Sequence, residues 1–387
     1  MDAIVVVILV IVVALVFDFT NGFHDTANAM ATSVATGALK PRVAVLISAV
    51  LNLVGAFLST AVAKTVSDGI LTESDKGIPH ITTTMIFAGL VGAVLWNLAT
   101  WWLGLPSSST HALFGGLIGA AVIGTGVSAV NFGGVVSKIL LPALLSPFIA
   151  GAVGLVATFL AYRITKMAST RGADTGFRHA QTVSASLVSL AHGTNDAQKT
   201  MGIVTLTLIV AGYQEAKTGP QLWVILACGL AIALGTYTGG WRIMRTIGKR
   251  ITDVQAPQGF AAETSSASTI LISSTLGFPL STTQVTSGSV VGAGLGKRLA
   301  GVHWGVVGKI AIAWLVTLPA AALVGGLATY LAVTGTFGLV AVVLVGIVGA
   351  AVFILLARRK PITRTNVNDT DDAAEPSPEN PTLEKVS

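Results

Sequence analysis

Two short polar stretches lie inside apolar parts of the sequence and hold its most reactive side chains. The stretch NGFHDTANAM contains His24 and Asp25, and HGTNDAQKTM contains Asp196 and Lys199. A carboxylate in apolar surroundings needs a proton, a cation or hydrogen-bond donors beside it. His24 can exchange a proton near neutral pH, and on a helix Lys199 lies within reach of Asp196, three residues earlier. These residues therefore suit ion binding and proton exchange, unless they form purely structural ion pairs.

Two hydroxyl-rich runs, PSSSTH and PLSTTQ, begin at Pro106 and Pro279. If each run begins a helix, its free N–H groups and partial positive charge attract an anion. The hydroxyl groups add donors without formal charge, which suits an oxyanion that must bind and later leave; the alternative is that they only bond to helix backbones. We expect anion contacts from these runs and from two asparagines near the carboxylates: Ser108, Ser109, Thr110, Ser281, Thr282, Thr283, Asn28 and Asn195.

The four motifs form an internal repeat. NGFHDTANAM, which starts at residue 21, aligns with HGTNDAQKTM, which starts at residue 192. PSSSTHALFGGLIGA, from residue 106, aligns with PLSTTQVTSGSVVGA, from residue 279. Because both pairs occur in the same order at nearly the same offset, 171 and 173 residues, we expect the two halves of the chain to have related folds.

Composition places these motifs in a membrane protein. Of the 387 residues, 52% are hydrophobic and 10% are charged, whereas soluble proteins contain about 25% charged residues. The single cysteine, Cys228, excludes a disulfide scaffold. The net charge of +6 does not indicate nucleic-acid binding, because the basic residues lie in short loops between apolar runs. The sequence therefore predicts an all-α polytopic membrane protein surrounded by the lipid bilayer.

Four apolar segments are too long to be simple membrane-crossing helices. A straight helix over 4–38 would extend about 52 Å, against a hydrocarbon core of about 30 Å. A polar stretch lies in its middle, so we expect a broken helix there and a second one in 183–211. The segments 84–125 and 256–296 each contain a proline and a polar run, which predicts two re-entrant helical hairpins.

Loop charge predicts the topology. Most Lys and Arg residues lie in five regions, which the positive-inside rule places in the cytoplasm: 40–42, 163–178, 242–250, 297–298 and 358–360. This threading puts the N-terminus outside the cell membrane, the C-terminal tail in the cytoplasm and the two halves in opposite orientations. Inverted repeats of this kind are common in secondary transporters. The expected parts are a first repeat (1–162), a basic cytoplasmic linker (163–182), a second, inverted repeat (183–331), a final transmembrane helix (332–357) and a disordered polar cytoplasmic tail (358–387).

The motifs resemble those of a known family. NGFHDTANA and HGTNDAQK are similar to the paired signatures of the inorganic phosphate transporter (PiT) family, written around G-x-N-D-x-A-N, and PSSSTH and PLSTTQ resemble its second paired motif. The resemblance covers most of residues 15–300 and is to the bacterial low-affinity Pit branch rather than to the sodium-coupled branch. It implies an ion-coupled phosphate symporter with alternating access, which is not an enzyme and needs no cofactor. Whether the chain forms a homodimer stays open.

The coupling ion is the least determined part of this prediction. Asp25 and Asp196 would repel a phosphate dianion unless positive charge lies between them. We expect His24 with Asp25 to form a proton site and Lys199 to supply a fixed countercharge, with Glu263 as a further ion-coupling residue. Sodium bound by the two aspartates is the second choice, and transport of a metal–phosphate complex stays open.

Other functions fit the same sequence less well. A sulfate permease of the same fold is the main alternative, and a passive anion channel is a weaker one. An intramembrane hydrolase is disfavoured, because metal sites need three or four ligands and no second histidine-rich set aligns with the first. The roles of Asp18, His111 and Gln284 stay open.

Overall fold

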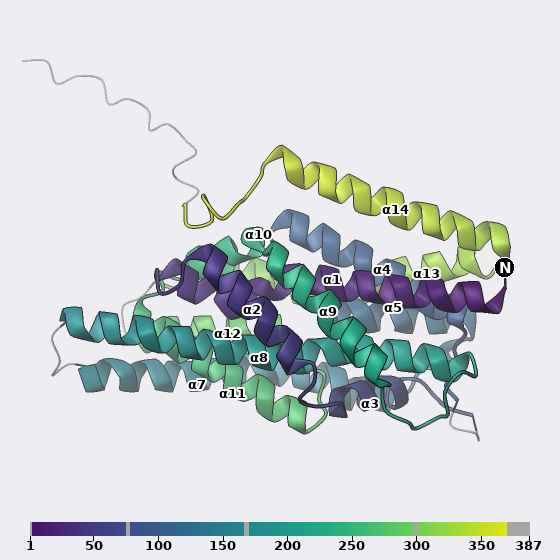
Figure 1. The fold of residues 1–387 in the computed structure, drawn as a ribbon, viewed down its shortest axis with the longest axis horizontal. Helices are drawn as coiled ribbons and strands as arrows, with labels where there is room; N and C mark the ends of the chain where they lie inside the picture. Colours follow the sequence, from purple (N-terminus) through teal and green to yellow (C-terminus); the bar gives the residue numbers. More distant parts are fainter. Residues whose placement is uncertain (1, 75–77, 166–169, 298–300, 370–387) are drawn as a thin grey trace, which may run out of the picture.

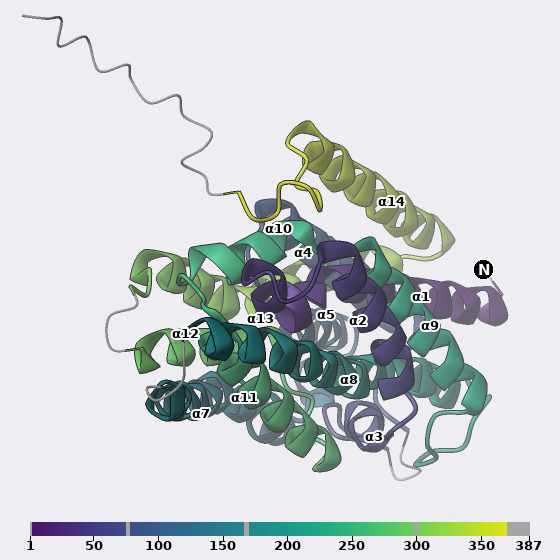
Figure 2. The ribbon, with the colours of Figure 1, turned by 60° about the vertical axis from the view of Figure 1, so that its left-hand side comes forward.

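The computed structural model describes residues 2–74, 78–165, 170–297 and 301–369. Within these ranges the regular elements are helices, which pack into one elongated bundle (Figures 1 and 2). The α-helices are α1 (Ala3–Ala35), α2 (Pro41–Gly55), α3 (Ala61–Asp68), α4 (Thr83–Leu103), α5 (Ser109–Gly124), α6 (Phe132–Val135), α7 (Leu141–Thr165), α8 (Thr170–Val210), α9 (Leu222–Thr238), α10 (Trp241–Arg245), α11 (Ala256–Thr275), α12 (Thr282–Gly296), α13 (Trp304–Ala332) and α14 (Thr336–Arg359). Short 3₁₀ or π-helical turns, Val127–Ala129, Val136–Leu140 and Thr246–Arg250, lie between them.

Several helices have the length and composition of membrane-crossing segments. Five spans among the described residues meet both conditions, α1, α4, α6 with α7, α13 and α14, and a sixth is formed if α9 and the bent α10 region count as one. Large apolar side chains such as Phe148 and Leu315 face outward, 70% and 77% exposed. A surface of this kind suits lipid rather than water. The structure thus agrees with an all-α polytopic membrane protein.

The expected breaks in the two long polar helices are wrong: α1 is one helix of 33 residues and α8 is one helix of 41. The length argument failed because α8 begins well before its apolar part, and a long helix can tilt in the bilayer. Nor does the polar stretch break the backbone. Hydroxyl groups there bond to carbonyl groups of the preceding turn, as Thr26 Oγ1 does to Gly22 (2.6 Å) and Thr194 Oγ1 to Leu190 (2.8 Å). Such bonds satisfy the side chains without unwinding the helix.

Two helix pairs are joined by tight tips. Helix α4 ends at Gly104, whose φ of 66° needs glycine, and Ser108 caps the start of α5. The second tip repeats this arrangement, with Gly277 (φ 77°) after α11 and Ser281 capping α12. The proline between glycine and serine in each tip cannot continue the first helix. Each tip therefore joins two helices that pack on each other, and the re-entrant course of these hairpins stays a prediction.

Close backbone contacts occur twice, once for each half of the chain. Gly22 on α1 lies against α9, where an added Cβ would meet the carbonyl oxygen of Ile232 at 2.3 Å. Its repeat partner, Gly193 on α8, lies against α2, where a Cβ would meet that of Asn52 at 2.2 Å. The hairpin helices show the same exchange, with α5 against α13 and α12 against α7: Gly115 with Leu318 and Gly288 with Pro147. Each half therefore supplies helices that pack on the other half.

The two ends of the bundle carry different loops. At one end, the segment after α3 pairs with the segment before α6, through Leu71 and Val130. At the other end, Lys249 Nζ donates to the carbonyl of Ala35 at 3.1 Å, and Arg245 donates to the carbonyl of Asn366. The end of α1, the basic segment 242–250 and the chain after α14 thus lie together, away from the N-terminus (Figure 1). The expected disordered tail (358–387) is described as far as residue 369, where Val367 is buried; residues 370–387 lie outside the described residues.

Candidate functional site

The first carboxylate of the site, Asp25, lies on α1 and is 2% exposed. Nδ1 of His24 lies 2.6 Å from Asp25 Oδ1. The two hairpin tips also reach it, because Thr283 Oγ1 donates to Oδ1 (3.2 Å) and Ser109 Oγ donates to Oδ2 (3.4 Å). The other nitrogen of His24, Nε2, lies 3.3 Å from Thr100 Oγ1 on α4. Asp25 therefore accepts from both tips while His24 links it to α4.

The second carboxylate, Asp196, lies on α8 and is 1% exposed. Lys199 Nζ donates to its Oδ1 at 2.7 Å. Its Oδ2 accepts from Asn21 Nδ2 at 3.3 Å and lies 3.2 Å from His192 Nε2. The fixed charge of Lys199 is itself 1% exposed, so this ion pair lies out of contact with water.

The hydroxyl of Thr282 joins the two carboxylates. Its Oγ1 lies 3.3 Å from Asp25 Oδ2 and 3.2 Å from Asp196 Oδ2. His192 Nε2 lies 4.0 Å from Asp25 Oδ2, so one ring nitrogen lies near both acids. One ligand atom each from Asp25, His192 and Asp196 lies within 4.8 Å of the others, a spacing that fits a bound cation.

Both hairpin tips direct a helix N-terminus at this cluster. Ser108 Oγ accepts from the His111 N–H (3.1 Å), and Ser281 Oγ accepts from the Gln284 N–H (3.4 Å). These bonds fix the first turns of α5 and α12. The remaining N–H groups and the helix dipoles create positive potential there without a formal charge. His111 and Gln284, whose roles the sequence leaves open, thus contribute backbone N–H groups to the caps.

Each long helix also bonds to a tip from the other half of the chain. Lys199 Nζ donates to Thr110 Oγ1 in the first tip (2.6 Å), and also to the carbonyl of Leu280 in the tip of its own half (2.7 Å). Asn28 Nδ2, at the repeat-equivalent position, donates to Thr283 Oγ1 (3.0 Å). Thr110 and Thr283 are also equivalent in the repeat, so the contact of Lys199 with Thr110 corresponds to that of Asn28 with Thr283. At this pair of positions the site differs between halves by one charge.

Two predicted site residues lie outside the cluster. Asn195 Nδ2 donates to Ser274 Oγ (2.8 Å) and to the carbonyl of Phe278 (3.3 Å), which supports the end of α11. Glu263 accepts from three other side chains: Thr32 Oγ1 (2.7 Å), Gln181 Nε2 (3.1 Å) and Ser184 Oγ (2.5 Å). Thr32 follows Asp25 by two helical turns, about 10 Å along α1, so Glu263 forms a separate buried polar group.

Two residues of the cluster, His192 and Asn21, are not among the site residues predicted from the sequence. A signal was available, because His192 precedes Asp196 by four residues and so faces it on a helix. The other signal was the repeat: His192 aligns with Asn21, and each contacts or approaches the aspartate of the other half. Only the antiparallel packing of α1 on α8 brings these pairs together, and no local pattern predicts it.

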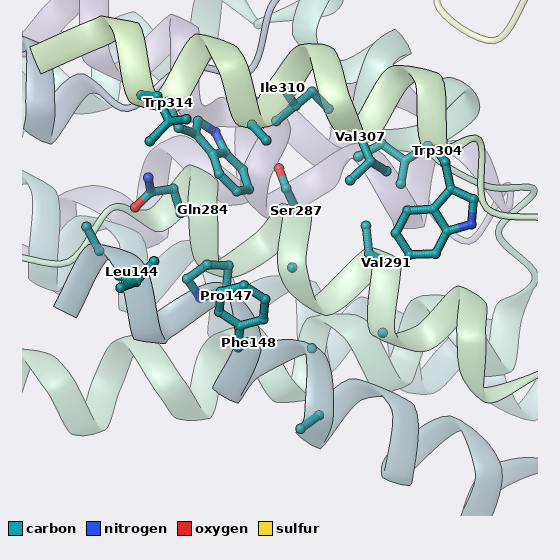
Figure 3. A pocket seen from close by; sticks show the side chains of 18 of the residues that line it. Leu144, Pro147, Phe148, Gln284, Ser287, Val291, Trp304, Val307, Ile310 and Trp314 are labelled. Atoms are coloured by element: carbon teal, nitrogen blue, oxygen red, sulfur yellow. The ribbon is translucent and has the colours of Figure 1, made fainter. Parts of the chain in front are cut away.

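A separate cavity lies on another side of the tip helices (Figure 3). It measures about 600 Å³, and its walls come mainly from α7, α12 and α13. Its polar side chains are His111, Gln284 and Ser287; the rest of the lining is apolar apart from backbone groups. A dianion would lose its hydration there without gaining charged partners. The cavity is therefore a poorer anion site than the buried cluster at the tips.

The bundle of apolar helices encloses buried carboxylates, a buried ammonium group and two helix N-termini. This combination is typical of a membrane transport protein. The chain belongs to the phosphate transporter family, whose model matches residues 21–325. This confirms the resemblance stated above.

Named relatives agree with this assignment. The chain is 52% identical over 373 residues to a probable low-affinity inorganic phosphate transporter of Mycobacterium tuberculosis, covering 93% of this chain and 86% of that one. It is 42% identical to one from Bacillus subtilis, over 84% and 97% of the two chains. The structure resembles that of a protein described as the sodium-dependent phosphate transporter, with a TM-score of 0.71, 27% identity and coverage of 84% and 98%. These relatives are transporters, not enzymes.

Proposed function

We propose that this protein carries inorganic phosphate across the cell membrane by symport with a cation, with phosphate bound between the hairpin tips and the two aspartates. The observation that carries the proposal is the meeting of the N-termini of α5 and α12 at Asp25 and Asp196. Hydroxyl groups of Ser109 and Thr282, now within hydrogen-bond distance of the carboxylates, are placed to donate to a phosphate oxygen instead. Backbone N–H groups at the same helix ends add to that binding.

The aspartates favour phosphate over sulfate. Hydrogen phosphate and dihydrogen phosphate carry O–H groups that can donate to a carboxylate, whereas sulfate at neutral pH has none. Sulfate would leave Asp25 and Asp196 without that donor, and an unsatisfied buried acceptor is costly. This supports the phosphate assignment over the sulfate permease.

The contacts of Thr282 indicate where the coupling cation acts. Its hydroxyl has one hydrogen, so it can donate to only one carboxylate at a time. The other oxygen keeps its second donor, Ser109 for Asp25 or Asn21 for Asp196, but two carboxylates this close still repel each other unless a proton or a cation lies beside them. His24, 2.6 Å from Asp25, is the group that can supply a proton.

The position of Lys199 supports protons over sodium. Its Nζ lies 2.6 to 2.7 Å from three oxygen atoms, which belong to Asp196, Thr110 and Leu280. A sodium ion at this point would need these same oxygens, which the ammonium group already uses. Sodium at Asp25 and Asp196 remains the second candidate. A divalent metal arriving with phosphate is a third, because His192 adds a nitrogen ligand to the two carboxylates.

The transport step follows from the paired architecture. We propose that the two halves are inverted repeats, that both hairpins are re-entrant and that the halves alternate access to the site. The duplicated contacts of Gly22 and Gly193 support the repeat, and the grouping of the basic loops at one end supports the inversion. The cluster is closed to solvent on both sides of the membrane in this structure, because Asp25, Asp196 and Lys199 are at most 2% exposed. Closure favours alternating access over a passive channel.

Uptake of labelled phosphate into proteoliposomes tests the function. An inward proton gradient without sodium should drive accumulation, a sodium gradient at fixed pH should not, and an excess of sulfate should not compete. Sodium-driven uptake at fixed pH would overturn the proton assignment and leave the phosphate assignment standing. Competition by sulfate equal to that by phosphate would overturn the choice of anion.

A further inference from the structure

Asp18 is a buried carboxylate that the proposed site does not use. It lies on α1 seven residues before Asp25, which places it on the same face of the helix and about 10 Å nearer the N-terminus. Its side chain is fully buried, at 0% exposure. Neither of its carboxylate oxygens has a hydrogen-bond partner among the described residues.

The register of α1 against α8 shows what lies opposite Asp18. Asn21 contacts Asp196, and Asp25 lies 4.0 Å from His192, so residue numbers rise on α1 as they fall on α8. Continued toward the N-terminus, this register places Asp18 opposite Lys199 and Thr200. The hydroxyl of Thr200 is close enough to interact with Asp18, although neither side chain makes a hydrogen bond of ordinary length and angle within the described residues.

Few charged or titratable groups face Asp18. Those on α8 are Asp196 and Lys199, and α9 contributes the Cys228 thiol; α4 contains no titratable side chain. Lys199 has three N–H donors, and these already meet Asp196, Thr110 and Leu280. The one nearby cation is therefore committed to another partner within the described residues.

An ionised carboxylate cannot remain in this position without a partner. Its burial without compensation would cost far more than binding a proton. A metal cation is a poor substitute, because hard cations take about six oxygen ligands, whereas the residues on either side of Asp18 in the chain, Phe17 and Phe19, are apolar. The chemistry of the pocket therefore favours the neutral acid.

We propose that Asp18 is a second proton-carrying residue of the transport cycle, in addition to the Asp25 and His24 pair. In the closed state its carboxyl group keeps its O–H bond. When α1 and α8 separate and water reaches it, that bond breaks, water accepts the proton and a carboxylate is left; the reverse step reloads it. This inference rests on the proposed proton symport and adds one proton to its cycle.

The test compares purified full-length wild type with Asp18→Asn and Asp18→Glu in proteoliposomes. Asparagine resembles the protonated acid in shape but cannot release a proton, whereas glutamate can. We expect Asp18→Asn to keep exchange of labelled phosphate for phosphate, and to lose one proton per phosphate in net uptake measured with an internal pH dye. Asp18→Glu should restore that proton. An unchanged proton-to-phosphate ratio in Asp18→Asn would overturn the inference.

Infrared spectroscopy of the same proteins gives a readout that does not depend on transport. The wild type should show a carbonyl-stretch band of a protonated carboxylic acid at neutral pH that Asp18→Asn lacks; absence of that difference overturns the inference even if Asp18→Asn proves unstable in liposomes. Failure of the proposed function looks different. In that case the wild type itself would exchange no phosphate, or would take it up with sodium and without proton movement.

Discussion

The Asp25 carboxylate accepts from both hairpin tips and also touches His24, so in the proposed cycle it connects anion binding to proton binding. We expect Asp25→Asn to abolish proton-driven accumulation of phosphate, because an amide cannot cycle a proton. Exchange of internal for external phosphate, which needs no net proton movement, should continue. Asp174→Asn is the matched control, since Asp174 is an exposed acid paired with Arg178 on the surface. Accumulation by Asp25→Asn at the control rate would remove Asp25 from the coupling site.

Asp196 and Lys199 form a buried ion pair, and removing either partner alone should destabilise the fold. Breaking such a pair by removing one partner costs about 3–5 kcal/mol, because the remaining charge is left unpaired in a dry environment. Asp196→Asn should therefore lower the melting temperature in detergent, and adding Lys199→Gln should recover most of the loss. The double variant is the control, since it removes the charges without leaving one alone. Equal stability of the single variant and the wild type would show that Lys199 finds another counterion.

Most of the residues that meet in this cluster could be predicted from sequence, because each belongs to a motif that occurs twice. Asp25, Asp196 and Thr282 meet as the repeat predicts. Other positions depend on long-range packing that no motif records. Asn195 turns toward the end of α11, and Glu263 bonds to α1 and α8 away from the aspartates. Residue type identified the polar groups, but packing of separate helices decided which of them share a site.

The two hairpin tips share one design: each combines a glycine turn, a proline, a serine cap and a donor threonine. Thr283→Val should weaken phosphate binding while the helix keeps its cap at Ser281. One lost hydrogen bond to a charged group is worth roughly 1.5–3 kcal/mol, so affinity should fall about tenfold or more. Thr275→Val, on the exposed end of α11, is the control. Isothermal titration with phosphate measures both, and matched affinities would place the anion elsewhere.

Helix α8 allows a matched comparison of two glycines on one element. A Cβ at Gly193 would lie 2.2 Å from the carbonyl oxygen of Asn52, whereas a Cβ at Gly176 meets nothing within 4 Å. Gly193→Ala should separate α8 from α2 and reduce both thermal stability and transport. Gly176→Ala should be neutral or slightly stabilising, because alanine favours the helix. Similar melting curves for the two variants would mean that the contact at Gly193 is not close in the membrane.

Helices α1 and α8 are continuous, although the sequence predicts a break in each. Sequence length and polarity correctly marked α1 and α8 as unusual, but they could not show where the polar side chains find partners. Thr26 bonds within its own helix, and Asn21 bonds to the other one. Because these polar side chains are already hydrogen-bonded, the helix does not need to unwind to satisfy them.

For the whole molecule, the charge pattern predicts the orientation in the membrane. In a Cys228→Ser background, a cysteine placed at Gly176 should react only with a reagent that enters the cytoplasm. A cysteine placed at Ser74, in the loop at the opposite end of the bundle, should react with an impermeant reagent from outside. Labelling intact cells with each reagent measures this directly. Reaction of the Gly176 position from outside would reverse the proposed topology and place the N-terminus in the cytoplasm.

The exchange of helices between halves constrains how the protein is made. Helix α1 carries Asp18 and Asp25 into the membrane early in synthesis, yet the surface that receives Gly22 belongs to α9, which leaves the ribosome some 200 residues later. Until then, α1 must wait in the translocon or beside a membrane chaperone, since lipid cannot satisfy its acids. The first half is thus an incomplete product by itself. Separately expressed halves should be degraded alone and survive together, because each completes the other.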